Sequence, residues 1–232
     1  MSLLKNKNIL ITGATGGVGE EFAHQLSKQG CNLFLTGTSS SKLKQVSKKI
    51  STLSYYEPCD LTRDINSLIS CVRDTIKDID ILINCAGVFI TKSIRESSEE
   101  DFQKSFDVNV KAPFLLIKEF SKDMINKKWG RIINMGSSSS YAGFSGTSIY
   151  CSSKHAMLGL SRSVYNELKD KNVRTFCFSP GSIKTEMGKK VKDQDFSTFI
   201  EPKELCKYII SAITFDSDMI SEEVRFNRID IQ

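Results

Sequence analysis

Short apolar runs alternate with amphipathic stretches along the chain, and this alternation restricts the fold more than any other feature. The runs that we interpret as strands are Asn8–Thr12, Asn32–Thr36, Ser54–Pro58, Ile79–Ile83, Arg131–Met135 and Arg174–Phe178. Most are nearly continuous in Ile, Leu, Phe or Val, the pattern of parallel strands that are covered on both faces. Strand–helix alternation implies right-handed crossovers between parallel strands. We therefore expect a three-layer α/β fold with a mostly parallel, doubly wound sheet.

The stretches between these runs predict helices. Lys42–Ile50 places its apolar residues on one stripe, and Ser97 with Glu100 has the spacing of a capping box that would open a long helix. Pro202 stands where the first turn of another helix would begin. Because no linker, repeat or low-complexity tract divides the chain, we expect one domain over residues 1–232.

Composition narrows the class of protein. Of 232 residues, 40% are hydrophobic and 25% charged, and the net charge of +5 is spread along the chain, so nucleic acid is not an expected partner. The chain lacks an apolar run of the roughly 20 residues that would cross a bilayer. Its seven cysteines include no Cys-x-x-Cys pair, and neither His24 nor His155 has a second ligand at metal spacing. We expect reduced thiols, no metal and a cytoplasmic location.

A glycine-rich segment follows the first strand. Thr12-Gly13-Ala14-Thr15-Gly16-Gly17-Val18-Gly19 leads into a helix that contains Phe22 and Leu26. Glycines in such a turn let the main chain approach a pyrophosphate, and the helix N-terminus directs N–H groups toward it. The spacing differs from Gly-x-Gly-x-x-Gly, and a purely structural turn is the alternative. Between a strand and a helix, however, this pattern favours a dinucleotide site.

The end of the second strand bears on which dinucleotide is bound. An NAD site has an acidic residue about 20 residues beyond the glycines, which binds the ribose 2′-hydroxyl. This chain has Thr36-Gly37-Thr38-Ser39-Ser40-Ser41-Lys42 there, without an acid to repel a 2′-phosphate and without an arginine to clamp one. The segment favours NADP(H), with NAD(H) as the alternative.

Tyr150-Cys-Ser-Ser-Lys154 places a phenol and an ammonium one helical turn apart. A tyrosine hydroxyl titrates near pH 10 in model peptides, and a neighbouring positive charge lowers that pKa. The pair is therefore a candidate acid/base device. Taken alone, the spacing also fits an amphipathic helix with a solvated lysine.

Several separated motifs now occur in order: the glycine-rich segment, Asn84-Cys85-Ala86-Gly87, Asn109, Ser137, Tyr150-x-x-x-Lys154 and Pro180-Gly181. From about residue 6 to Met187 the chain resembles the short-chain dehydrogenase/reductase family, which has a single-domain Rossmann fold. The segments 130–137 and 179–187 are similar to those of the 3-oxoacyl-[acyl-carrier-protein] reductases. The resemblance implies an NAD(P)(H)-dependent oxidoreductase that reduces a ketone or oxidises a secondary alcohol.

The resemblance also assigns roles to matching positions. It implies that Tyr150 exchanges the proton, Lys154 assists it and binds the nicotinamide ribose, Ser137 binds the substrate oxygen and Asn109 holds a water. Ser138 is the alternative to Ser137. The implied cofactor contacts are Gly13, Thr15, Gly17, Val18, Gly19, Thr38, Ser39, Asp60, Leu61, Asn84, Ala86, Gly87, Tyr150, Lys154, Pro180, Gly181, Ile183 and Thr185.

The last third of the chain departs from the family pattern. The segment 188–200 is short for a substrate lid, and the Gly-Gly pair that follows the last strand in relatives is absent. The substrate is therefore open between a 3-oxoacyl thioester, free or carrier-bound, and a sugar or other small ketone. A protein that senses the cofactor without turnover is the remaining alternative. The family further implies a homodimer or homotetramer formed through two long helices near 99–127 and 149–169, and Lys128 and Lys171 as contacts for an acidic carrier protein.

Overall fold

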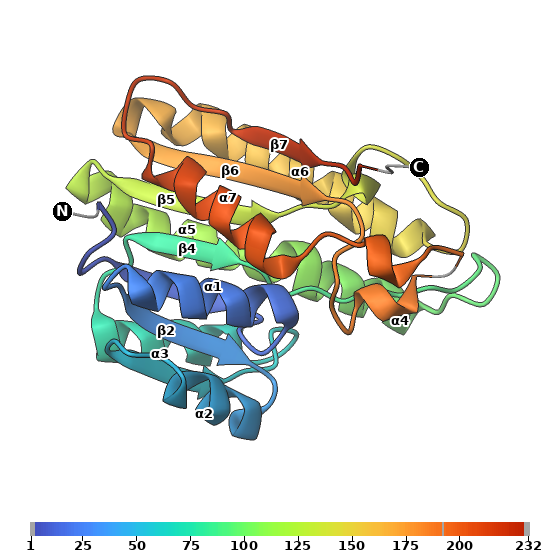
Figure 1. The fold of residues 1–232 in the computed structure, drawn as a ribbon, viewed down its shortest axis with the longest axis horizontal. Helices are drawn as coiled ribbons and strands as arrows, with labels where there is room; N and C mark the ends of the chain where they lie inside the picture. Colours follow the sequence, from blue (N-terminus) through green and yellow to red (C-terminus); the bar gives the residue numbers. More distant parts are fainter. Residues whose placement is uncertain (1–2, 192, 230–232) are drawn as a thin grey trace.

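A computed structural model describes residues 3–191 and 193–229, and within them one sheet crosses the molecule. Its strand order is β3-β2-β1-β4-β5-β6-β7, and every neighbouring pair is parallel. The strands are β1 (Asn8–Thr12), β2 (Asn32–Gly37), β3 (Ser54–Pro58), β4 (Ile81–Asn84), β5 (Gly130–Met135), β6 (Val173–Pro180) and β7 (Glu223–Phe226). The expected doubly wound α/β fold is confirmed, and Figure 1 shows the strand arrows running toward one common edge.

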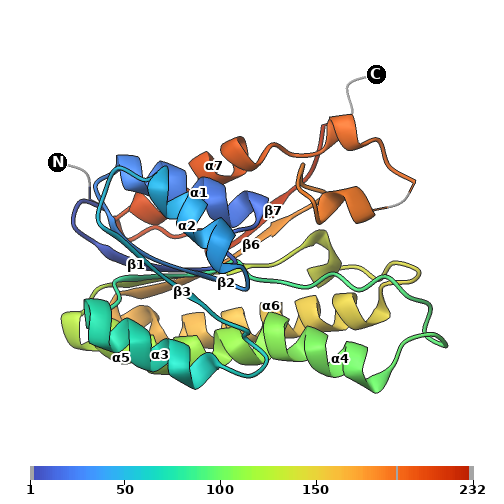
Figure 2. The same ribbon diagram turned by 90° about the horizontal axis from the view of Figure 1, so that it is seen from below.

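Helices cover both faces of the sheet, as Figure 2 shows edge-on. The helices are α1 (Gly17–Lys28), α2 (Ser40–Lys48), α3 (Ile65–Ile76), α4 (Glu99–Phe106), α5 (Ala112–Lys127), α6 (Ser148–Leu168) and α7 (Pro202–Thr214). Helices α1, α2 and α7 lie on one face, and α3, α5 and α6 lie on the other. Among the described residues, no helix is both long enough and apolar enough to cross a bilayer.

The side chains of the central strands divide between two cores. Ile9 and Ile11 pack toward α1 and α7, whereas Leu10 between them packs toward α3 and α5. Successive side chains of a strand point to opposite faces, so a strand covered on both sides has to be apolar at each position. This explains why the strands could be read from nearly continuous apolar runs.

Most predicted elements agree with the structure. Strands β1 and β3 have the expected bounds and α7 begins at Pro202, while β4 is displaced toward Asn84. Helix α3 and strand β7 were not predicted. The predicted capping box was wrong by one residue: Ser98 caps α4 and pairs reciprocally with Asp101. Ser97, one residue earlier, instead donates a hydrogen bond to the main chain of Ser93.

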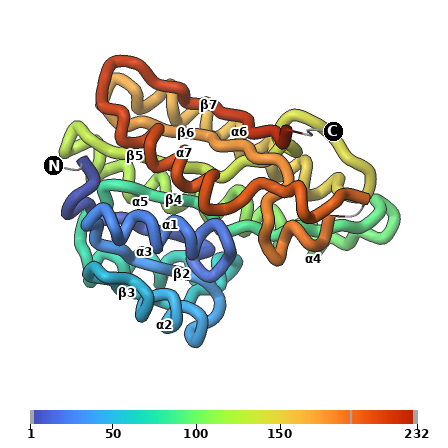
Figure 3. The backbone as a smooth tube through the Cα atoms, in the orientation of Figure 1, coloured from blue at the N-terminus to red at the C-terminus, as the bar shows by residue number. Residues whose placement is uncertain are grey.

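The long helix expected from residue 99 to 127 is interrupted. A π-helical turn, Asp107–Lys111, separates α4 from α5, and Asn109 lies at its centre. Such turns are rare in proteins, but many of those that occur lie at functional sites. The widened backbone displaces side chains and carbonyl groups from the regular helical pattern. Helix α4 lies beyond the ends of the strands, as the backbone trace shows (Figure 3).

Candidate active site

The ends of β1 and β4 are joined by one hydroxyl group. The Oγ1 atom of Thr12 accepts hydrogen bonds from the main-chain N–H groups of Cys85 and Ala86, each at 3.1 Å. Gly13 follows with a φ of +66°, and a Cβ atom there would lie 2.7 Å from the Cα atom of Ala86. Only glycine fits this position, since a side chain would be strained and would collide with the neighbouring turn.

The glycine-rich segment leaves the start of α1 open. Gly16 is the N-cap, and among the described residues no side chain caps this end. A Cβ atom at Gly19 would lie 2.2 Å from the oxygen of Gly13, so the segment folds tightly against itself. Val18 is buried, and its main-chain oxygen accepts a bond from the Cys206 thiol at 3.5 Å. An uncapped helix start that is lined by glycines fits a pyrophosphate.

The end of β2 lies beside this segment. A Cβ atom at Gly37 would come within 3.0 Å of the Thr15 hydroxyl oxygen, so the two turns touch. Thr38 is exposed, and Ser39 caps α2 by accepting the Lys42 N–H at 3.4 Å. The α2 N-terminus and the hydroxyl groups of these turns form a polar surface that suits a phosphate.

Asp60 and Leu61 follow β3, two strands away from β1 in the sheet. The Oδ1 atom of Asp60 accepts from the main-chain N–H of Thr62 at 3.0 Å and from its hydroxyl at 2.8 Å. These hydrogen bonds, with the main-chain bond first, lower the pKa of Asp60. The ionised carboxylate is thus held in one orientation at the far end of the proposed dinucleotide cleft.

Lys154 and Tyr150 are both nearly buried on α6, at 6% and 9% exposure. The Nζ atom of Lys154 donates to the main-chain oxygen of Met135 at 2.7 Å and lies 5.7 Å from the centre of the Tyr150 ring. A Cβ atom at Gly87 would lie 4.0 Å from this ammonium group. The structure therefore places the predicted phenol and ammonium together at the ends of β4 and β5.

Ser137 begins a short 3₁₀ turn, Ser138–Ser140, two residues beyond Met135. Its Oγ atom accepts the N–H of Ser139 at 3.1 Å, and its own N–H donates to the Ser140 hydroxyl at 3.1 Å. A hydroxyl group has one hydrogen to donate and two lone pairs. Because the Ser139 bond uses a lone pair, the hydrogen of Ser137 is left for an oxygen in the site.

Asn109 faces the same place from the π turn. Its Oδ1 atom accepts the Val88 N–H at 2.9 Å, and its Nδ2 atom donates to the Val88 oxygen at 3.1 Å and the Ser153 hydroxyl at 3.0 Å. The Oδ1 atom would be 3.4 Å from a Cβ atom at Gly87. Its side chain therefore joins the turn after β4 to α6, the helix that carries Tyr150.

The segment after β6 closes over the glycine-rich turn. Gly181 donates to the main-chain oxygen of Phe226 at 2.9 Å, next to Pro180 at the end of β6. Ile183 forms a parallel bridge with Ile200. The methyl group of Thr185 would lie 2.8 Å from a Cβ atom at Gly17, so this segment reaches the start of α1.

The side chain of one predicted contact, Asn84, is engaged within the sheet. The amide of Asn84 donates to Asn134 on the neighbouring strand at 2.8 Å, in a buried network that continues to Ser161 of α6. Its side chain thus braces the sheet. Phe89, by contrast, was missed: its ring meets the Tyr150 ring edge-on, with centres 4.7 Å apart. Nothing in the sequence distinguished Phe89 from an ordinary packing residue.

Lys128 and Lys171 lie at the amino-terminal ends of the strands, opposite the candidate active site. They precede β5 and β6, and the Asn172 side chain donates to the main-chain oxygen of Lys128 at 3.0 Å. A partner that docks on these lysines would therefore approach the end of the sheet that lies away from Tyr150 and Ser137.

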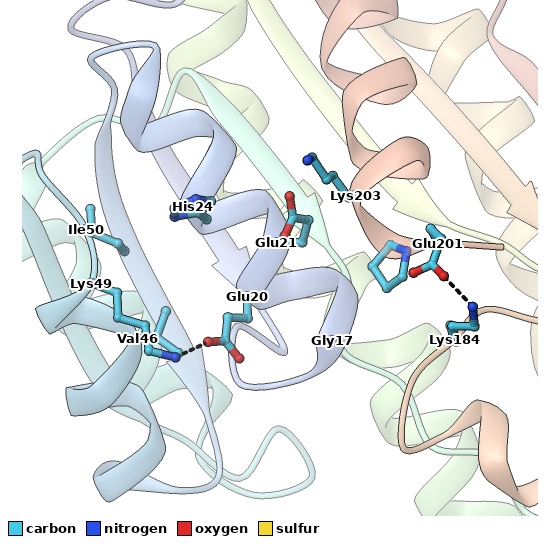
Figure 4. Close-up of a pocket in the computed structure, with 11 residues that line it drawn as sticks. Gly17, Glu20, Glu21, His24, Val46, Lys49, Ile50, Lys184, Glu201 and Lys203 are labelled. Atoms are coloured by element: carbon cyan, nitrogen blue, oxygen red, sulfur yellow. Dashed lines mark hydrogen bonds and ion pairs between the residues drawn. The ribbon is translucent and has the colours of Figure 1, made fainter. Parts of the chain in front are cut away.

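A groove of about 400 Å³ lies on the outer side of α1, between α2 and α7 (Figure 4). Its lining is Gly17, Glu20, Glu21, His24, Val46, Lys49, Ile50, Lys184, Glu201, Pro202 and Lys203. Lys49 pairs with Glu20, and Lys184 pairs with Glu201. These ion pairs bring charges of both signs together, so the groove is a poorer phosphate site than the uncapped start of α1.

Comparison with known proteins identifies the family of this chain. Residues 7–195 match the family model described as short chain dehydrogenase. The chain belongs to the short-chain dehydrogenase family. It is therefore an NAD(P)-dependent oxidoreductase, as the resemblance in its motifs implied. It is 33% identical over 204 residues to the 3-oxoacyl-[acyl-carrier-protein] reductase FabG of Rickettsia typhi, covering 87% of this chain and 83% of the relative.

Solved structures of two other oxidoreductases have the same fold. A metagenomic short-chain oxidoreductase in complex with NADP superposes with a TM-score of 0.84 at 26% identity, over 97% of this chain and 98% of the other. An alcohol dehydrogenase from Thermococcus sibiricus, complexed with 5-hydroxy-NADP, gives a TM-score of 0.87 at 23% identity, with 98% of each chain covered.

Proposed function

We propose that this protein is an NADPH-dependent ketone reductase in which Tyr150, Lys154 and Ser137 act on the substrate and cofactor, and Asn109 holds the turn beside them in place. The observation that carries the proposal is the placement of the Lys154 ammonium group. It lies 2.7 Å from the Met135 oxygen and close to the Tyr150 ring. Met135 leads directly into residues 137–140, which we call the serine turn. The bound dinucleotide supplies the hydride; the protein supplies orientation and a proton.

Two hydroxyl groups act on the substrate oxygen. The carbonyl oxygen gains negative charge as hydride arrives, and the Ser137 hydroxyl donates a hydrogen bond to it. Tyr150 gives its proton to the same oxygen, while the Lys154 charge stabilises the phenolate that remains. One well-placed donor of this kind is worth about 3–4 kcal/mol in other enzymes.

The proton that Tyr150 loses has to be replaced from solvent. The Asn109 side chain is committed to Val88 and Ser153, so it holds the π turn in place rather than handling the proton itself. In our proposal, this turn holds the water that connects Lys154 to solvent. In the reverse direction the same groups would accept the proton of an alcohol.

The cofactor residues suit NADPH over NADH. The glycine-lined start of α1 would receive the pyrophosphate, and the first turn of α2, Ser40-Ser41-Lys42, carries no acidic residue. Thr38, Ser39 and Lys42 would bind the 2′-phosphate. Asp60 would contact the adenine, and Ile183 and Thr185 the nicotinamide. The relative that was solved with NADP at 26% identity supports this preference.

A 3-oxoacyl thioester is the substrate that we propose, supported by the 33% identity to the Rickettsia typhi reductase. An apolar acyl chain also suits the rim of the site. Ile94, Phe144 and Met187 lie on the three loops that follow β4, β5 and β6, and all three are exposed. All seven cysteines are free thiols and five of them are buried, which fits a reducing, cytoplasmic setting.

The decisive test is NADPH oxidation by the wild type and by Tyr150→Phe, with acetoacetyl thioesters, keto-sugars and small ketones as substrates. We expect turnover of the thioesters, and a loss of about 10²- to 10⁴-fold in the variant with NADPH binding retained. Turnover of keto-sugars alone would replace the proposed substrate. Binding of NADPH without oxidation by any ketone would indicate a cofactor sensor, and full activity of Tyr150→Phe would exclude this acid.

We also propose a homodimer or homotetramer through α4, α5 and α6. Phe102 and Phe114, on α4 and α5, are 47% and 48% exposed, an apolar surface that a second copy would cover. Sedimentation should give a dimer or tetramer at micromolar concentration, and Phe114→Glu should shift it toward smaller species. A monomeric wild type would contradict the assembly.

A further inference from the structure

The turn that carries Ser137 is connected to a carboxylate on the last strand. Ser137 and Ser140 are bonded to each other through the 3₁₀ turn, and the next residue is Tyr141. The Tyr141 hydroxyl donates to Oε1 of Glu223 at 2.9 Å. Glu223 begins β7, where it is paired in register with Cys177 of β6. The far end of the serine turn is thus tied to the sheet.

The same carboxylate also binds the helix of the proposed acid. Arg162 of α6 donates to Glu223 twice, from Nε at 2.8 Å and from Nη2 at 2.9 Å. Two parallel bonds between a guanidinium and a carboxylate fix direction as well as distance. The Arg162 side chain is 57% exposed, so we expect this ion pair to add little to global stability. The ion pair matters instead for geometry, because it connects Glu223 to α6, the helix that carries Tyr150 and Lys154.

The charge states suit this connection. Burial raises the pKa of Tyr141 to about 12; a hydrogen bond with Ser179 acts in the opposite direction, and the Glu223 carboxylate adds to the rise. The hydrogen bonds from Arg162 hold the pKa of Glu223 below its usual value. At neutral pH a neutral phenol therefore donates to an ionised carboxylate. The Arg225 guanidinium lies 4.4 Å from the centre of the Tyr141 ring and holds that ring from one side.

We propose that Tyr141 and Glu223 are positioning residues for Ser137, which keep the serine turn in register with the helix that bears Tyr150 and Lys154. The inference rests on the proposed function for the role of Ser137. Neither residue touches the reacting atoms; both act through the turn. The consequence is that the final strand, in the part of the chain that departs most from related reductases, helps to set the geometry of the site.

Tyr141→Phe removes the hydroxyl group and keeps the ring beside Arg225. We expect kcat to fall about 10- to 100-fold, the loss that a displacement of about 1 Å can cause, with NADPH affinity and melting temperature unchanged. Tyr165→Phe is the matched control, since Tyr165 lies on α6 far from the serine turn and its ring faces Lys169. Equal activity of the two variants would overturn the proposal.

If Tyr141 acts through Ser137, the effects of substituting the two residues should not add. In a Ser137→Ala background, Tyr141→Phe should cause little further loss, because the group that it positions has been removed. Glu223→Gln, which keeps an acceptor for the Tyr141 hydroxyl, should retain more activity than Glu223→Ala. An undiminished loss without the Ser137 hydroxyl would show that Tyr141 acts elsewhere and would overturn the proposal.

Hydrogen exchange tests the geometry without turnover. The amides of residues 137–141 should exchange faster in Tyr141→Phe than in the wild type and in Tyr165→Phe, with the rest of β5 and α6 unchanged. Unchanged exchange in this segment would overturn the positioning role. If the wild type reduces no ketone, the proposed function fails, and the exchange result alone decides whether Tyr141 holds the turn.

Discussion

The Lys154 ammonium group donates to the main-chain oxygen of Met135 at 2.7 Å, which fixes a buried charge at the carboxyl end of β5. Met135 comes two residues before Ser137, so helix α6 and the serine turn meet through this bond. Burying an ammonium ion is costly unless its hydrogens are bonded, and this bond meets part of the requirement. The remaining hydrogens of the ammonium group can serve a ribose or a water.

This relationship predicts the effect of removing the charge. Lys154→Met keeps a chain of similar length and removes both the charge and the donor, so we expect kcat for ketone reduction to fall about 10²- to 10⁴-fold. Lys169 is exposed and directly follows α6. Lys169→Met is therefore the control and should retain full activity. Stopped-flow measurement of NADPH oxidation would check the prediction; a loss of less than tenfold would contradict it.

Gly13 should tolerate no side chain. Gly13→Ala forces a φ of +66° on an alanine and places its Cβ atom 2.7 Å from Ala86, so we expect a loss of at least about 1–2 kcal/mol in the free energy of unfolding and weaker NADPH binding. Gly143 has open space around it and no positive φ. Gly143→Ala should therefore unfold in urea at the wild-type concentration or slightly above. Equal midpoints for the two variants would refute the strain argument.

Cofactor preference should respond to charge at the end of β2. Thr38→Asp would place a carboxylate beside the proposed 2′-phosphate, and we expect NADPH affinity to fall by at least about tenfold while NADH affinity holds or rises. Asparagine has nearly the same shape as aspartate but no charge, so Thr38→Asn should keep the wild-type preference for NADPH over NADH. Titration of both dinucleotides by calorimetry would decide; an unchanged ratio in Thr38→Asp would place the phosphate elsewhere.

Arg131 has no exposed surface, and its Nη2 atom donates to Asp216 at 2.6 Å. Burial lowers the pKa of Arg131 to about 10, with Arg174 adding to the effect and Asp216 opposing it. Asp216→Ala leaves the buried guanidinium without this partner, and we expect a loss of about 1–3 kcal/mol in urea unfolding, because Asp216 itself is partly exposed. Asp218→Ala, two residues further along the same loop, is the control. Equal stability of the two variants would show that the pair is dispensable.

The sequence was sufficient for the parts of this fold that depend on local pattern. Apolar runs located the strands because both faces of the sheet are covered, and Pro202 marked the start of α7 because proline is suited to a first helical turn. Strand β7 was missed because it has only four residues and is only partly buried, so it lacks the continuous apolar run by which the other strands were recognised. The capping box was misplaced because adjacent serines are each followed three residues later by an acid.

The site was predictable only where a role depends on residue type and spacing. Tyr150 and Lys154 lie together because they are one helical turn apart, whereas the bond by which Thr12 joins the turns after β1 and β4 depends on the order of the strands in the sheet. The π turn at Asn109 and the contacts of Phe89, Tyr141 and Glu223 depend on how distant segments pack. No local pattern contains that information.

The bridge between Ile183 and Ile200 brings the two ends of the intervening loop together at its base. The part of that loop beyond Thr185, the residue that we assign to the nicotinamide, can therefore be lengthened, shortened or exchanged while β6 and α7 keep their paths. A graft of the corresponding segment from another reductase, joined after Thr185 and at Ile200, offers a route to new substrate preference with the cofactor contacts kept.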